Sequence, residues 1–169
     1  MNSAPRPQQV RQHGAAVVEF AMISLIFFTL LFGALELARM MYIYNTLQEV
    51  TRRAAREMTV RWITQEATVK TLALFGSASL PGGAMIDSSS INIEYLTADG
   101  NPVTVFPSDP SDNLSACGDA TRTASCIYSV RVTINPTNYS PMLSLFSAFN
   151  IAMPGSSVTM HAESMGFES

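Results

Sequence analysis

The sequence predicts an α+β protein anchored by one long N-terminal transmembrane helix, which continues into a small head domain with an antiparallel β-sheet. Three observations support this fold class. An almost uncharged apolar run fills residues 15–35, apolar side chains then recur every three or four positions to about residue 58, and beyond residue 83 strict alternation replaces this period. We therefore divide the chain into a leader (1–14), a membrane span (15–36), an extramembrane continuation of the helix (37–75) and an α+β head (76–169).

The first fourteen residues are polar and contain no acidic side chain. Arg6, Arg11 and His13 make the segment basic. This composition is typical of a short region that stays on the cytoplasmic side of a membrane.

The apolar run reads AAVVEFAMISLIFFTLLFGAL, twenty-one residues in which Glu19 is the only charge. At a rise of 1.5 Å per residue a helix of this length spans about 30 Å, the thickness of a bilayer core. A cleavable secretory signal is the competing interpretation, but its apolar part is about 7–15 residues long and ends at a small-residue cleavage site. Here the run is longer, and Gly33 and Ala34 precede a continuing helical pattern. We therefore predict a transmembrane helix.

Glu19 needs an explanation, because a carboxylate within an apolar membrane helix costs on the order of a few kcal/mol. If the chain is cut after Gly14, the new α-amino group of Ala15 lies one helical turn from Glu19. That amine, or the amine of a neighbouring subunit, would neutralise the carboxylate. The alternative is an isolated acid at the membrane edge.

These features resemble the processing site of type IV prepilins, and the stretch 14–56 is similar to the TadE-like pseudopilins of tight-adherence (Flp) type IVb pilus systems. Three motifs carry the resemblance. They are the junction G-A-A-V-V-E-F, the G-x-x-E-x-x-R run of Gly33, Glu36 and Arg39, and Y-N-x-L-Q followed by R-x-A-A-R.

The resemblance implies cleavage between Gly14 and Ala15 by a prepilin peptidase, which is a separate protein. Glu19 would serve recognition or subunit pairing, and Phe20 keeps an aromatic side chain where many Flp-type pilins have tyrosine. It also implies a pilin-like fold and a role in Flp pilus assembly, with adhesion and biofilm formation as consequences. The implied partners are the peptidase, other pilins and pseudopilins, and inner-membrane pilus assembly proteins.

The orientation in the membrane follows from the processing signature. The count of positive charges on the two sides of the span does not favour a cytoplasmic N-terminus. Arg6 and Arg11 precede the span, whereas a larger set of arginines follows it: Arg39, Arg52, Arg53, Arg56 and Arg61. Prepilin cleavage at the cytoplasmic face implies a single-pass protein of the bacterial inner membrane with a periplasmic head, and leaves open whether the subunit enters a surface filament. Within lipid, the small residues Gly33, Ala34 and Ala38 are expected to pack against other helices.

Beyond the span, the apolar stripe is expected to pack against the head. Residues 62–75 either continue it or form a second helix before the Pro-Gly-Gly breaker that ends at residue 83. A sheet of about four strands is predicted from the alternating segments, with the second strand as hairpin partner of the first: 91–95, 103–106, 127–134 and 157–162. Residues 142–149 are expected to form a short helix or a membrane-proximal turn.

Cys117 and Cys126 lie in or next to a polar segment, 107–125, that reads as a surface loop. Their separation suits a local disulfide if the head lies outside the cytoplasm. The alternative is two unpaired thiols.

The sequence offers little for catalysis, so we expect no enzyme activity, no cofactor and no metal site. It has two histidines, His13 and His161, no phosphate-binding glycine loop, and no acidic spacing that fits an EF-hand. A net charge of −3 without a basic run excludes a nucleic-acid partner. The alternative to a pilus role is a single-pass periplasmic or surface binding module, for which neither cleavage after Gly14 nor Glu19 would matter.

Overall fold

The computed structural model describes residues 13–135, 138–148, 151–162 and 165–166. Contacts divide the chain into two units, Met1–Ala38 and Arg39–Ser169. The α+β fold class is confirmed: a long apolar N-terminal helix is followed by a small domain with antiparallel sheets.

Helix α1 runs without interruption over His13–Thr59. Its sequence is rich in Ala, Leu, Met, Glu and Arg and contains no proline, so intrinsic propensity favours the helix throughout. Among the described residues this one helix is long and apolar enough to cross a membrane, a test of length and composition that an N-terminal signal sequence also passes. None of the residues in its apolar window is buried.

Helix α1 ends at Thr59, short of residue 75. Trp62 adopts an extended conformation, and a 3₁₀ turn, η1 (Ile63–Gln65), leads into α2 (Glu66–Ala73). Of the two alternatives for residues 62–75, the chain therefore forms the separate second helix. A residue near the C-terminus caps the end of α1, because the Met165 amide donates to the Thr59 carbonyl at 3.1 Å.

Two short strands follow α2. Strands β1 (Ser79–Leu80) and β2 (Gly83–Asp87) pair antiparallel around Gly82, whose φ of 74° is readily accessible only to glycine. The predicted breaker is thus a tight reversal. A 3₁₀ turn, η2 (Ser88–Ser90), capped by the Asp87 carboxylate, then leads into the main sheet.

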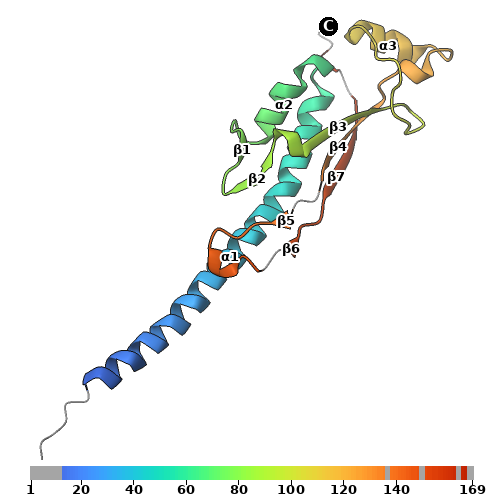
Figure 1. Cartoon of the computed structure of the whole chain (residues 1–169). Coiled ribbons are helices and arrows are strands. Elements are labelled where there is room, and N and C mark those ends of the chain that lie inside the picture. The colour runs from blue at the N-terminus through green and yellow to red at the C-terminus, as the bar shows by residue number, and fades with distance from the viewer. Residues whose placement is uncertain (1–12, 136–137, 149–150, 163–164, 167–169) are drawn as a thin grey trace, which may run out of the picture. The chain divides into compact units, whose positions relative to one another are not determined.

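The main sheet contains β3 (Ile91–Leu96), β4 (Ser129–Ile134) and β7 (Ser156–His161) in the order β3-β4-β7, all antiparallel (Figure 1). Its register aligns Ile93, Val132 and Val158 in one row across the sheet. Because alternate side chains share a face, the buried rows of the sheet lie on one side.

The predicted hairpin between 91–95 and 103–106 is wrong. The chain does reverse at Gly100 (φ 77°), but pairing is limited to an isolated bridge between Leu96 and Pro102. The Val103 amide still donates to the Tyr95 carbonyl at 2.9 Å, but the chain then bends at Thr104 and Val105, so residues 103–106 form no strand. β4 pairs with the opposite edge of β3, where its alternating apolar residues extend the buried face over six residue pairs.

The core of the second unit lies between α1 and this sheet. From Ile43 onward α1 contributes side chains that are almost completely buried, and the sheet contributes another set: Ile43, Leu47, Val50, Ala54, Ala55 and Met58 from α1, with Ile91, Ile93, Tyr95, Val130, Val132 and Ile134 from the strands. The Tyr95 hydroxyl reaches the Met58 sulfur at 3.6 Å, and burial raises the pKa of Tyr95. The stripe thus packs against the head from Leu47 to Met58, whereas Met41 and Tyr44 remain exposed.

The predicted surface loop 107–125 contains a helix, α3 (Pro110–Gly118), followed by a 3₁₀ turn, η3 (Thr123–Ser125). Its local signal is Asp109 as N-cap before Pro110, the arrangement preferred at helix starts. A disulfide joins Cys117 to Cys126, with Cα atoms 4.7 Å apart. The Asn113 side chain accepts a hydrogen bond from the Ile127 amide at 2.9 Å, so α3 is tied to the chain entering β4 twice.

Replacing both cysteines, Cys117→Ser with Cys126→Ser, is expected to lower the free energy of unfolding by about 2.5–3 kcal/mol, the chain-entropy value for so short a loop. The measurement is denaturant unfolding of the detergent-solubilised full chain. Reducing the unmodified protein should cause the same loss, and reducing the double variant should change nothing further. Equal stability of oxidised and reduced protein would contradict the prediction.

Acid should loosen α3 only at low pH. Hydrogen bonds from Ser111 lower the pKa of Asp109, and the Arg122 guanidinium, 2.7 Å away, lowers the pKa of Asp112. A lowered folded-state pKa means that the stabilisation is complete above the ordinary carboxyl pKa of about 3.9 and is lost as pH falls through the lower, folded value. NMR amide shifts of residues 111–118 should therefore stay constant from neutral pH down to about pH 4 and move below it. Asp109→Asn, which keeps a capping side chain without a charge, should reduce this acid transition.

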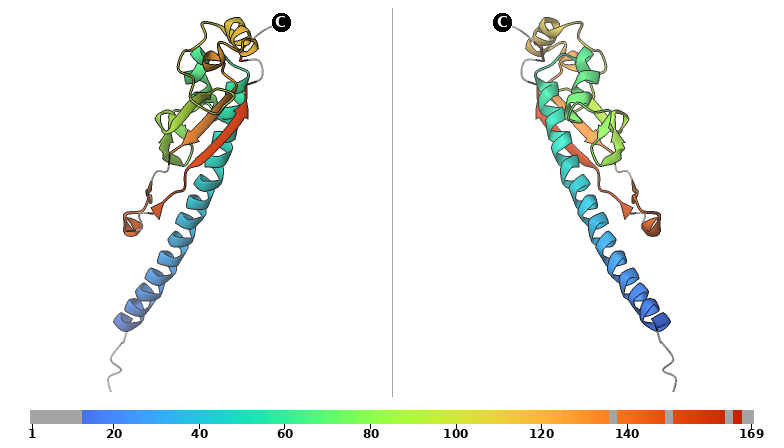
Figure 2. Two further views of the ribbon diagram at one scale, coloured as in Figure 1. Left: turned by 90° about the vertical axis from the view of Figure 1, so that its right-hand side faces the viewer. Right: turned by 90° about the vertical axis from the view of Figure 1, so that its left-hand side faces the viewer.

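The segment before β7 forms a strap, which we define as the described residues 138–148 and 151–154. It comprises β5 (Asn138–Tyr139), a 3₁₀ turn η4 (Ser144–Phe146) and β6 (Ile151–Ala152), with β5 and β6 paired antiparallel (Figure 2). In the described part of the predicted segment 142–149, the regular structure is limited to this three-residue turn, and a position near the membrane stays a prediction.

Candidate functional site: the exposed apolar helix and the start of the head

The predicted processing junction lies at the start of α1. Gly14 and Ala15 occupy its first turn, and both are exposed. A Cβ added to Gly14 would have no heavy atom within 4 Å apart from its neighbours in the chain and the backbone of its own helix. Packing within the chain therefore does not require glycine here. Arg6 and Arg11 of the leader lie outside the described residues.

Glu19 and Phe20 follow one turn later, also exposed, with Phe20 at 72%. In a helix, residues four apart are neighbours on one face, so Ala15 and Glu19 lie close together. A chain that began at Ala15 would bring its terminal amine into the neighbourhood of the Glu19 carboxylate.

The small residues lie far from this cluster. Gly33 follows Glu19 by fourteen positions, which is about 21 Å along the helix. Ala34 and Ala38 are four residues apart and share a face, and both are exposed. In the first unit, the residues predicted for processing thus lie at the start of the helix and the small side chains at its end.

Large apolar side chains cover the rest of this helix surface. Most of them are more than half exposed, among them Val17, Met22, Ile26, Phe27, Leu30 and Leu35. The Thr29 hydroxyl is satisfied within the helix, because it donates to the Leu25 carbonyl at 2.7 Å. Such a surface suits lipid or the apolar helices of other subunits.

Arg39 has a larger structural role than the sequence indicated. Its Nε donates to the Gly82 carbonyl at 2.8 Å, and its Nη1 donates to the Tyr139 hydroxyl at 3.0 Å and to the Ser140 carbonyl at 3.1 Å. The guanidinium also lies over the Tyr139 ring, 5.2 Å from its centre. One side chain of α1 thus holds both the β1–β2 reversal and the strap. Its place in the G-x-x-E-x-x-R motif was the available signal, but the partners are about 40 and 100 residues away in sequence.

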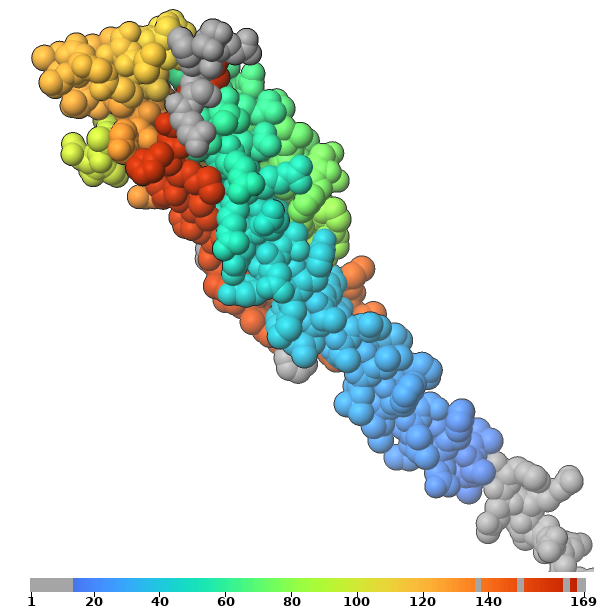
Figure 3. Space-filling model, turned by 180° about the vertical axis from the view of Figure 1, so that it is seen from behind, coloured from blue at the N-terminus to red at the C-terminus, as the bar shows by residue number. Residues whose placement is uncertain are grey.

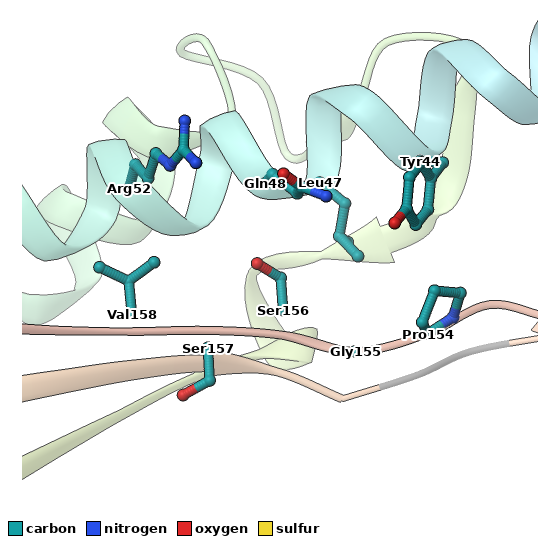
Figure 4. Close-up of a pocket in the computed structure, with 9 residues that line it drawn as sticks. All are labelled: Tyr44, Leu47, Gln48, Arg52, Pro154, Gly155, Ser156, Ser157 and Val158. Carbon is teal, nitrogen blue, oxygen red and sulfur yellow. The ribbon is translucent and has the colours of Figure 1, made fainter.

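Two grooves lie along α1 in the second unit. Figure 3 shows α1 and β7 side by side on one face, and Figure 4 shows the groove between them, about 270 Å³ in volume. Its walls are Tyr44, Leu47, Gln48 and Arg52 from α1 and residues 154–158 from the opposite side. The second groove, about 390 Å³, is apolar and lies between the α1 residues 40–45 and the strap residues 151–154.

Neither groove brings catalytic groups together. Among the described residues, no three His, Cys, Asp or Glu side chains are grouped so that they could hold a metal ion. His161 is exposed, with its ring centre 5.0 Å from that of Tyr128 in an edge-to-face contact.

Comparisons with known proteins identify the N-terminal part of the chain. Searches of curated proteins and of solved structures each found no significant match. The model of the TadE-like protein family matches residues 14–56, the same stretch in which the three motifs occur. This family is a structural one associated with tight-adherence pili, and one long apolar helix is consistent with a single-pass membrane anchor. Residues 14–56 are therefore similar to the TadE-like family, which confirms the resemblance over this stretch.

Proposed function

We propose that this protein is a membrane-anchored pseudopilin or minor pilin-like subunit that acts in the assembly of tight-adherence (Flp) pili. The observation that carries the proposal is the family match, which begins at Gly14, the residue predicted to precede the cleavage site. A prepilin peptidase cuts between Gly14 and Ala15, which leaves Ala15 as the new terminus and Glu19 as the fifth residue. The leader stays in the cytoplasm and the head lies in the periplasm.

The exposed apolar surface of the first unit supports an assembly role. The helix spans the inner membrane and meets helices of other pilins or of inner-membrane assembly proteins at Gly33, Ala34 and Ala38, where small side chains permit close approach. Glu19 pairs with the terminal amine of a neighbouring subunit. An unpaired carboxylate is unfavourable in lipid, so this ion pair favours association of the subunits. The head disulfide agrees with a periplasmic location, since disulfides persist in oxidising compartments.

The decisive experiment is intact-mass and N-terminal analysis of the protein purified from membranes of its native host and of a strain lacking the prepilin peptidase. A mature chain that starts at Ala15 in the first strain and at Met1 in the second supports the proposal. An uncut chain in both strains would favour the anchored binding module. Removal of the whole apolar run would favour an ordinary secreted protein.

Replacing Glu19 by glutamine should separate processing from assembly. We expect a chain that is still inserted, with cross-linking to neighbouring pilus subunits reduced about tenfold or more, because the loss of one ion pair in lipid exceeds 1.4 kcal/mol. The readout is cross-linking yield in native membranes, and the matched control is Glu49→Gln, an exposed acid of the same helix in the second unit. Unchanged cross-linking by the Glu19 variant would rule out the pairing role.

A further inference from the structure

The strap is unusual in its chemistry. From Val132 to Ala162 the sequence contains no Asp, Glu, Lys or Arg. Within this stretch the strap exposes large apolar side chains: Met142 (75%), Leu145 (64%), Ile151 (45%) and Leu143 (38%). Four uncharged polar residues, Asn138, Ser140, Ser144 and Ser147, are exposed among them. The result is an apolar surface with hydrogen-bonding groups and no charge.

The strap is firmly held to the first turns of α1 in the second unit. Arg39 bonds to both Tyr139 and Ser140, and the apolar groove brings residues 151–154 beside Met40, Met41 and Tyr44. The buried side chains of Tyr139 and Met153 belong to the hydrophobic core. The exposed side chains therefore project from a segment that is fastened at both ends.

These first turns lie close in the chain to the membrane span. Arg39 comes one helical turn after Leu35, the last residue of the apolar run, and Tyr42 and Tyr44 follow within the next turn and a half. Both tyrosines are exposed, at 47% and 41%. Tyrosine rings and an arginine directly after an apolar span are typical of the lipid headgroup layer, where amphipathic side chains place one end in lipid and the other in water.

We propose that the strap lies in the headgroup layer of the same bilayer that the anchor spans, on the side of the head. Met142, Leu143, Leu145 and Ile151 dip among the lipid chains, and the serine and asparagine side chains bond to headgroups. The head would then contact the membrane at two places, α1 and the strap, which restricts its rotation and tilt. The inference rests on the membrane anchor within the proposed function, but not on its pilus role.

Lipid fits this surface better than a second protein does. Protein interfaces surround their apolar centre with a polar rim that commonly carries charges, whereas no charge lies within the strap. Its apolar side chains also come from several short pieces of chain, with Leu145 in the three-residue turn η4 and Ile151 in the two-residue strand β6, and these offer no long face for a partner helix.

The test uses the full chain, one copy per lipid nanodisc, with a single environment-sensitive fluorophore attached to an introduced cysteine. Cys117 and Cys126 are joined to each other and do not react with the label. Leu145→Cys reports on the strap. Leu114→Cys on α3, with an exposure of 62% against 64%, is the matched control in the head, and Ile26→Cys reports on the anchor. Lipids with a nitroxide at the headgroup or deep in the acyl chain serve as quenchers.

We expect the headgroup nitroxide to quench the label at 145 about twofold or more, with little effect on the label at 114. The deep nitroxide should quench the label at 26. Iodide in solution serves as a quencher of labels exposed to water. If the label at 145 behaves like that at 114, the strap faces water, and if neither nitroxide lipid nor iodide quenches it, the strap faces protein. Either outcome overturns the inference. If the label at 26 is not quenched either, the anchor itself fails, which distinguishes loss of the proposed function from loss of the strap contact.

Discussion

The variant Gly14→Leu is expected to remain at full length in membranes in which the unmodified chain is completely processed. The physical reason is steric, because a peptidase that cuts after glycine must bring the backbone of this residue close to its catalytic groups, and a leucine side chain prevents that approach. The chain's own packing predicts no other effect, since a Cβ at position 14 would meet no atom within 4 Å outside its own helix backbone and its chain neighbours. Intact mass of the membrane-purified protein measures the outcome.

The matched control is Gly118→Leu. Gly118 ends α3 in the head and, like Gly14, has nothing within 4 Å of an added Cβ and no positive φ. This variant should be processed like the unmodified chain. A Gly14→Leu chain that still begins at Ala15 would contradict the predicted cleavage site, and accumulation of both precursors would indicate a general defect of insertion.

The second large effect is expected on stability. Met58 is completely buried on the face of α1 that packs against the sheet, and its sulfur lies 3.6 Å from the Tyr95 hydroxyl. Met58→Ala should lower the free energy of unfolding of the head by about 2–5 kcal/mol, because it removes buried methylene groups and leaves a cavity between α1 and β3. Trp62, the single tryptophan, lies four residues further on and provides a fluorescence signal for denaturant unfolding of the solubilised full chain.

Met41→Ala on the same helix is the control, since the intrinsic change in helix propensity is equal. Met41 is 57% exposed, so its replacement should change the free energy of unfolding by no more than about 0.5 kcal/mol. Similar losses for the two variants would show that α1 is not held to the sheet through this face.

The candidate site depends on short-range information, and the sequence therefore predicts most of it. The apolar run, the acid at position 19 and the small residues near position 34 all lie within one helix, whose period is set by the backbone. Their neighbours along α1 follow directly from spacing. The same holds for the Asp109-Pro110 helix start, whose local signal lay within a segment interpreted as a loop.

What only the tertiary structure decided depends on contacts between distant parts of the chain. The strand partner of β3 lies beyond a segment of more than thirty residues, because β4 offers six residue pairs with a buried apolar face. The nearer alternating segment 103–106 bends away after a single bridge. Likewise, Arg39 bonds to Gly82 and Tyr139, which are far from it in sequence. The bond to Tyr139 holds the charge-free strap beside α1, and only there do its apolar side chains form one surface. Periodicity determines which face of an element is apolar, whereas the choice among several possible partners depends on packing and hydrogen bonding summed over the whole fold.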